Sequence, residues 1–225
     1  MHSPLRSLGM HTAYQRRSMS RGLSRWTHLY IVAAALWLPA AAVLAQATPG
    51  RELLNSERIQ ANFGTYGIEV LEQDQNVRVS NLYSFPRAGD RTCRTFAVVQ
   101  YAPSMDPAIR AQHAAIVAGG SIGAVFAASG WEVRKRNLSY GERPATAKLA
   151  ALMRIATDTQ LAEHVYALDV VKGGRTIEYA TIVEIHHPAY LRLADLTKIY
   201  GPVSGEQSRV ASVSAMRALV AQRAR

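Results

Sequence analysis

Residues 165–185 read VYALDVVKGGRTIEYATIVEI, and this stretch decides the fold. Two runs rich in Val, Ile, Tyr and Thr, residues 165–171 and 176–185, flank the turn Lys172-Gly173-Gly174-Arg175. β-branched and aromatic residues favour strands, and a Gly-Gly pair supplies the positive φ angles that a tight hairpin turn needs. The stretch therefore predicts a long antiparallel hairpin, which Pro188 ends.

The chain around this hairpin predicts further strands and short helices. Strand patterns cover residues 68–71, 77–83, 95–101 and 131–140, and helix patterns cover residues 55–63, 107–117, 122–128, 145–155, 189–200 and 210–224. Asn55 and Ser56 supply the expected cap of the first helix. Hairpins without alternating strand and helix units indicate an α+β domain with a single antiparallel β-sheet of five or six strands. We expect the helices to cover one face of that sheet.

The first 45 residues have the features of a cleavable secretory signal. They carry five arginines and no acidic residue, and an apolar run follows over residues 29–44. Small residues allow cleavage after Ala45 or Ala47, with Ala45 preferred. We expect a periplasmic or secreted protein with a signal peptide over residues 1–45, a linker over residues 46–54 and no stable membrane anchor after cleavage. Whether translation starts at Met1 or Met19 stays open.

The net charge of +10 overstates how basic the exported part is, because the five leader arginines leave with the signal and lower it to +5. The remaining basic residues are scattered, and the run Arg134-Lys135-Arg136 alternates along an expected strand like a solvated face. This distribution does not indicate nucleic acid as a partner. Cys93 is the single cysteine, so no internal disulfide can form, and a buried small residue is its expected role.

Several other motifs have a structural explanation that we prefer. His186 and His187 are neighbours in an extended segment, so they point to opposite faces and cannot chelate a metal together. His113 and His164 have no partner at ligand spacing. The glycine-rich residues 119–123 lack the lysine of a phosphate loop and join two helices, so we expect a helix junction.

The candidate site consists of charged residues on strands that should be largely apolar. Arg78, Arg94 and Glu184 each lie in or beside an expected strand. Two arginines that face a carboxylate suit a small organic acid bearing a hydroxyl group. Charges on the solvent face of an antiparallel sheet would explain the same residues.

The order and spacing of several segments resemble the chorismate pyruvate-lyase family and its fold relatives. The resemblance spans residues 55–190 and leaves residues 191–225 as a C-terminal helical extension. It is carried by residues 56–64, 67–73, 77–83, 93–99, 120–126 and, most closely, 173–184.

The resemblance implies elimination of pyruvate from chorismate to give 4-hydroxybenzoate, without metal or organic cofactor. It implies that Arg78 and Arg94 bind substrate carboxylates and that Glu184, the catalytic residue, hydrogen-bonds the ring hydroxyl and directs proton movement. Two alternatives stay open. The protein could be a non-catalytic module that binds a small, aromatic carboxylate, or a structural accessory protein of the envelope.

Overall fold

The computed structural model describes residues 53–85, 87 and 89–225. The signal peptide, its cleavage sites and most of the 46–54 linker lie outside the described residues. The strands are β1 (Gly67–Gln73), β2 (Val77–Ser84), β3 (Thr92–Tyr101), β4 (Glu132–Pro144), β5 (Gln160–Lys172) and β6 (Arg175–His186). The helices are α1 (Asn55–Phe63), the 3₁₀ turn η1 (Pro107–Ile109), α2 (Arg110–Val117), α3 (Ile122–Ala128), α4 (Ala147–Met153), α5 (Leu193–Tyr200) and α6 (Val213–Arg223).

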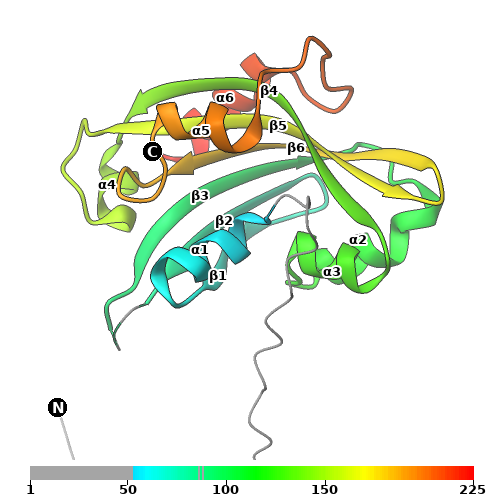
Figure 1. Ribbon diagram of the computed structural model, residues 1–225, viewed down its shortest axis with the longest axis horizontal. Coiled ribbons are helices and arrows are strands. Elements are labelled where there is room, and N and C mark those ends of the chain that lie inside the picture. The colour runs from blue at the N-terminus through cyan, green and yellow to red at the C-terminus, as the bar shows by residue number, and fades with distance from the viewer. Residues whose placement is uncertain (1–52, 86, 88) are drawn as a thin grey trace, which may run out of the picture. The chain divides into compact units, whose positions relative to one another are not determined.

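The six strands form one antiparallel sheet in the order β1-β2-β3-β6-β5-β4 (Figure 1). This confirms the predicted α+β class. The order divides the sheet into two meanders, β1-β2-β3 and β4-β5-β6, which meet where β3 pairs with β6.

The predicted hairpin is the β5–β6 pair, closed by Lys172 opposite Arg175. Gly173 and Gly174 have φ angles of 57° and 77°, the left-handed conformation that favours glycine. Val183 and Ile185 pack on one face of the sheet, while Ile182 packs on the other. Side-chain alternation therefore buries both faces of this strand.

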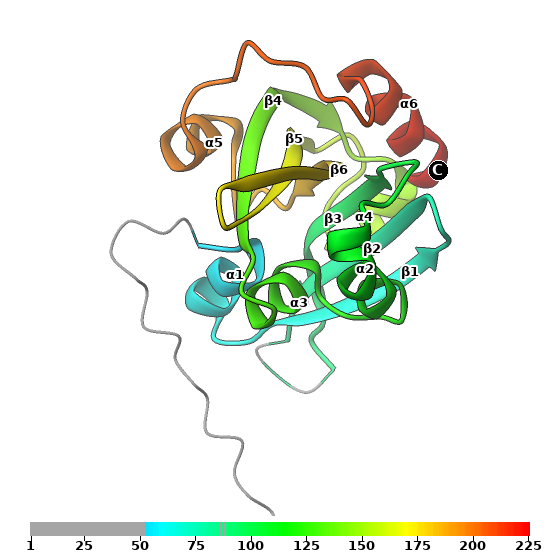
Figure 2. The same ribbon diagram turned by 90° about the vertical axis from the view of Figure 1, so that its right-hand side faces the viewer.

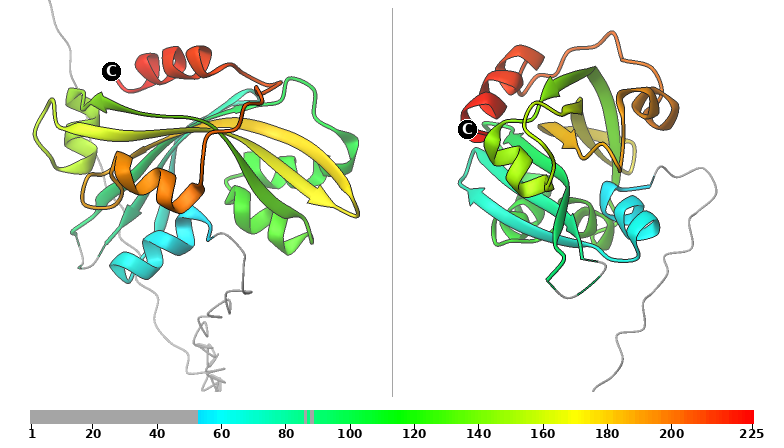
Figure 3. Two further views of the ribbon diagram at one scale, coloured as in Figure 1. Left: turned by 45° about the horizontal axis from the view of Figure 1, so that its top comes forward. Right: turned by 90° about the vertical axis from the view of Figure 1, so that its left-hand side faces the viewer.

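Helices cover both faces of the sheet, so the expectation of a single covered face is wrong. Leu149 of α4 and Val220 of α6 join one core cluster with Val183. Ile116 of α2 and Phe126 of α3 pack on the opposite face, where α1 and α5 also lie. Figures 2 and 3 show α6 on the side of the sheet opposite to α1 and α5.

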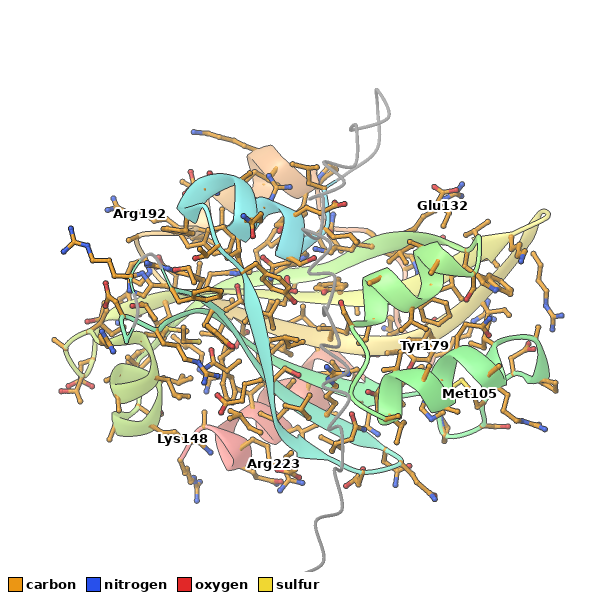
Figure 4. The ribbon with its side chains drawn as sticks, turned by 90° about the horizontal axis from the view of Figure 1, so that it is seen from below. Met105, Glu132, Lys148, Tyr179, Arg192 and Arg223 are labelled. Atoms are coloured by element: carbon orange, nitrogen blue, oxygen red, sulfur yellow. The ribbon has the colours of Figure 1, made fainter. Side chains whose placement is uncertain are left out.

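The C-terminal helices belong to the core of the domain. Leu196 of α5 is fully buried with Ile59 of α1, and Met216 of α6 is 1 % exposed. In Figure 4, Lys148 of α4 and Arg223 of α6 lie close together, and Lys148 Nζ donates to the Arg223 carbonyl at 2.7 Å. Within the described part of the chain, no helix is both long and apolar enough to span a membrane.

Candidate functional site

A cavity of about 100 Å³ lies between the sheet and the helices α1 and α3. Its wall is mostly apolar, with side chains such as Leu82, Val99 and Ile182. The polar residues that also line it are Asn55, Ser56, Tyr66, Arg78, Ser80, Ser121, Lys135, Tyr166 and Glu184. A small apolar pocket with a few convergent polar groups is the usual form of a ligand site.

Arg78 is held rigidly at the cavity. It is 1 % exposed, and its Nε donates to Ser80 Oγ at 2.9 Å. Its Nη1 donates to the carbonyls of Ile116 at 3.2 Å and Gly120 at 2.7 Å. The glycine-rich α2–α3 junction thus holds a guanidinium group with its carbonyls. The third nitrogen, Nη2, is buried and has no hydrogen-bond partner among the described residues, which leaves its two N–H groups for a ligand.

Glu184 lines the same cavity and is 4 % exposed. Burial raises the pKa of its carboxyl, but the Lys135 ammonium and the hydrogen bonds from Asn55 and Tyr166 outweigh burial and hold the pKa below its usual value. Glu184 Oε1 accepts a hydrogen bond from Asn55 Nδ2 at 3.0 Å, and Glu184 Oε2 lies 3.8 Å from Lys135 Nζ. The carboxyl group is therefore ionised at neutral pH.

Asn55 fixes the start of α1 over the sheet. The Tyr190 hydroxyl donates to Asn55 Oδ1 at 2.6 Å, so the amide nitrogen faces Glu184 and Thr95. The N-cap position belongs to Leu54, and Asn55 is the first helical residue. The predicted capping role of Asn55 is therefore wrong, because its side chain turns inward to the carboxylate.

Lys135 is the charged residue of the cavity that was not predicted from the sequence. The side chain is 7 % exposed, and Nζ lies 4.8 Å from the Tyr166 ring centroid and 4.5 Å from the Tyr200 ring centroid. Arg134 does face solvent, where it pairs with Glu132. The prediction of a solvated face for the whole basic run is wrong at Lys135, because neighbouring residues of a strand point to opposite faces. The sequence shows that Lys135 points to the face of the strand opposite to Arg134 and Arg136. It does not show which of the two faces is turned toward the cavity.

The cavity holds an excess of positive charge. Two cations, Arg78 and Lys135, share it with one carboxylate, Glu184. Burial raises the pKa of Tyr66 to about 12, so its hydroxyl stays protonated and neutral. A buried charge without a counter-charge is unfavourable. The arrangement therefore suits an anion with a single negative charge.

Arg94 does not line this cavity, so the structure brings together two of the three predicted site residues. A register shift between Leu82 and Tyr83 of the β2–β3 pair leaves Arg94 without a cross-strand partner. Its Nε donates to Ser84 Oγ at 2.8 Å, and its guanidinium carbon lies 3.9 Å from the Phe63 ring centroid. Such β-bulges redirect a side chain locally, and strand periodicity does not reveal them.

The histidines divide into two groups. His187 Nδ1 accepts a hydrogen bond from the Ala189 amide at 2.9 Å. His187 is not in the cluster of possible metal ligands that contains His186, as the opposite directions of the two side chains predicted. His113 pairs with the Tyr179 hydroxyl at 3.0 Å. His164, for which no ligand partner was expected, lies with Glu184 and His186 in a buried cluster whose possible ligand atoms are all within 4.8 Å. Spacing along the chain could not reveal it, because His164 and Glu184 are partners across two strands.

Cys93 is 1 % exposed, and burial raises the pKa of its thiol to about 12. A thiol that stays protonated is a poor nucleophile, so the predicted role as a small buried residue agrees with the structure.

The fold and the cavity together define an α+β domain with a buried, charged pocket. No protein-family model matches the chain, and a search of curated proteins also finds no match.

Proposed function

We propose that this protein binds a small aromatic carboxylic acid in the cavity between the sheet and the helices α1 and α3. The observation that carries the proposal is the excess positive charge of Arg78 and Lys135 over Glu184 in a buried pocket. A bound carboxylate would neutralise it. Charge-assisted hydrogen bonds to guanidinium are among the strongest polar contacts that a protein offers to a carboxylate.

The other groups of the cavity suit a ring with a hydroxyl group. Apolar side chains, among them Leu82, Val99 and Ile182, provide contact for the ring faces. The ionised Glu184 accepts hydrogen bonds only, so it would bind the hydroxyl of the ligand. A hydroxylated benzoate offers a carboxylate to Arg78 and a hydroxyl to Glu184, and both residues line the cavity.

The size of the cavity limits the ligand. Its volume of about 100 Å³ is below the roughly 150 Å³ of an apolar cavity that holds benzene. Lining side chains must therefore move to admit even one aromatic ring. Leu54 and Gly123 both line the cavity and are in close contact, since a methyl group on Gly123 would lie 2.6 Å from the Leu54 side chain.

Replacement of Arg78 tests the proposal. In titration calorimetry with a panel of hydroxylated aromatic acids, we expect Arg78→Ala to weaken binding by about 2–4 kcal/mol, because it leaves the ligand carboxylate buried without its partner. Arg94→Ala is the matched control and should bind as the wild type does, since Arg94 lies outside the cavity. If no such acid binds the wild type, or if Arg78→Ala binds equally well, the role of a structural accessory protein replaces this proposal.

A second candidate function is the elimination of pyruvate from chorismate that the sequence resemblance implies. The observation in its favour is that Glu184, ionised and buried, shares the cavity with Arg78. Chorismate carries two carboxylates, and Lys135 supplies the second cation in place of Arg94. Catalysis would come from positioning of the substrate, with Glu184 on the ring hydroxyl.

Glu184→Gln separates the two candidates, because it keeps the shape of the side chain and removes its charge. In an enzyme, the substitution should lower the rate at which chorismate yields 4-hydroxybenzoate far more than it weakens product binding. In a binding protein, it changes affinity alone, and the wild type releases no 4-hydroxybenzoate from chorismate. Chromatographic measurement of both compounds provides the readout.

A further inference from the structure

Three buried side chains on β5 and β6 direct unused ring nitrogens and a carboxylate oxygen to one point. His164 faces Glu184 across the two strands, and His186 follows Glu184 by two residues on the same face of the sheet. Their exposed fractions are 0 %, 4 % and 0 %. One atom from each lies within 4.8 Å of the other two.

The protonated nitrogen of His164 is fixed by its partner. Asn137 Nδ2 donates to the carbonyls of Tyr200 and Pro202, so Asn137 Oδ1 is the atom that faces the ring. His164 Nε2 lies 2.9 Å from Asn137 Oδ1 and must be the donor. Nδ1 therefore carries a lone pair, and it is buried without a partner in the described part of the chain.

Glu184 and His186 are oriented by neighbours in the same way. Asn55 holds Glu184 Oε1, and Thr95 Oγ1 lies 3.1 Å from His186 Nδ1. The remaining atoms are Glu184 Oε2 and His186 Nε2, which lie 3.9 Å apart, beyond hydrogen-bond length. Outer partners that hold the second polar atom of each ligand are characteristic of metal sites.

We propose that His164 Nδ1, Glu184 Oε2 and His186 Nε2 bind a divalent transition-metal ion, for which Zn²⁺ is the probe. Two imidazoles and one carboxylate form a donor set that suits Zn²⁺ or Fe²⁺. Metal bonds of about 2.0–2.2 Å require each donor atom to move inward by less than about 1 Å. An ion there would bind three buried polar atoms that form no hydrogen bond within the described residues, of which Glu184 Oε2 is also in an ion pair with Lys135.

Lys135 opposes the ion, because its ammonium lies 3.8 Å from Glu184 Oε2. Arg58 is a second nearby cation and acts on His186 electrostatically. Lys135 therefore competes with the metal for the carboxylate. The metal site shares Glu184 with the proposed carboxylate cavity, but His164 and His186 do not line that cavity, so the two proposals can fail separately.

The test is titration of untagged, chelator-treated protein with Zn²⁺ in calorimetry, without any carboxylic acid present. We expect one ion per chain, with Co²⁺ giving the visible absorption of a low-coordinate site. His186→Gln should weaken binding about 100-fold or more, and loss of the outer partner in Asn137→Ala about 10- to 100-fold. Lys135→Met should tighten binding about tenfold or more, since it removes a like charge.

His187→Gln is the matched control, because it alters the neighbouring histidine outside the cluster, and it should bind Zn²⁺ as the wild type does. Circular dichroism of each variant without metal verifies that it is folded. The proposal is overturned if neither the wild type nor Lys135→Met binds an equivalent of Zn²⁺, or if folded His186→Gln binds as tightly as the wild type. Acid binding, measured separately in chelator, reports on the carboxylate cavity alone.

Discussion

His164 and His186 are buried as neutral imidazoles. Burial, together with the Lys135 charge, lowers the pKa of His164 to about 2, and burial lowers the pKa of His186 to about 4 despite the opposing effect of Glu184. Both values lie below the 6.5 of an exposed histidine. Below pH 6.5 the unfolded chain therefore binds protons that the folded chain does not bind. The free energy of unfolding falls as the pH falls.

We expect the free energy of unfolding, measured with urea in chelator, to fall between pH 6.5 and pH 5. Each of the two histidines contributes up to about 1.4 kcal/mol per pH unit, the full slope being reached near pH 5. His186→Gln should make the slope shallower by about that amount. An unchanged slope in this variant would show that His186 is protonated in the folded protein.

At this scale the sequence revealed part of the site. Arg78 and Glu184 stood out because a charge on an apolar strand needs an explanation, and both line the cavity. Lys135 and His164 could not be assigned, because their roles depend on strand pairing and on which face of β4 turns inward. Arg94 was misplaced because a register shift follows no simple periodicity.

The β5–β6 hairpin is the element on which both proposed sites depend, since β6 carries Glu184 and β5 carries His164. Gly174→Ala should lower the free energy of unfolding by about 1–2 kcal/mol, because a Cβ disfavours its left-handed φ of 77°. Gly205→Ala is the control, with no atom within 4 Å of an added Cβ and no such φ. Equal stability of the two variants in urea would contradict this account of the turn.

Elements were predictable where local signals were strong. The predicted hairpin, residues 165–171 and 176–185, lies within the observed strands, which are longer at both outer ends. β4 continues to Pro144, four residues beyond its predicted end. Hydrogen bonding to β5 keeps residues 141–144 in the strand conformation. The residues of a single strand do not reveal which strand it pairs with, so this extension could not be predicted.

At the scale of the whole molecule, the placement of helices on two faces was not predictable. The path of the chain decides which face α4 and α6 cover, and the residues of these helices do not encode that path. Export to the periplasm or secretion remains a proposal, which depends on the N-terminal leader over residues 1–45.

We expect N-terminal sequencing of protein from a Gram-negative host to find a mature chain that starts at Gln46 or Thr48, because small residues precede both bonds. Envelope protein that retains residues 1–30 would contradict cleavage of the leader.

The pairing of β3 with β6 has a consequence for the order of folding. Its partners, from Thr95 with His186 to Tyr101 with Ala180, are roughly 80–90 positions apart along the chain, whereas successive strands within each meander are joined by much shorter connections, the longest of which, residues 145–159, contains α4. Local hairpins form before distant pairings, so the two halves should acquire structure first and join last. Arg78 belongs to one half, while Lys135 and Glu184 belong to the other. The pocket therefore exists only once the chain has completed its folding, and a ligand that contacts both halves would hold that final junction closed.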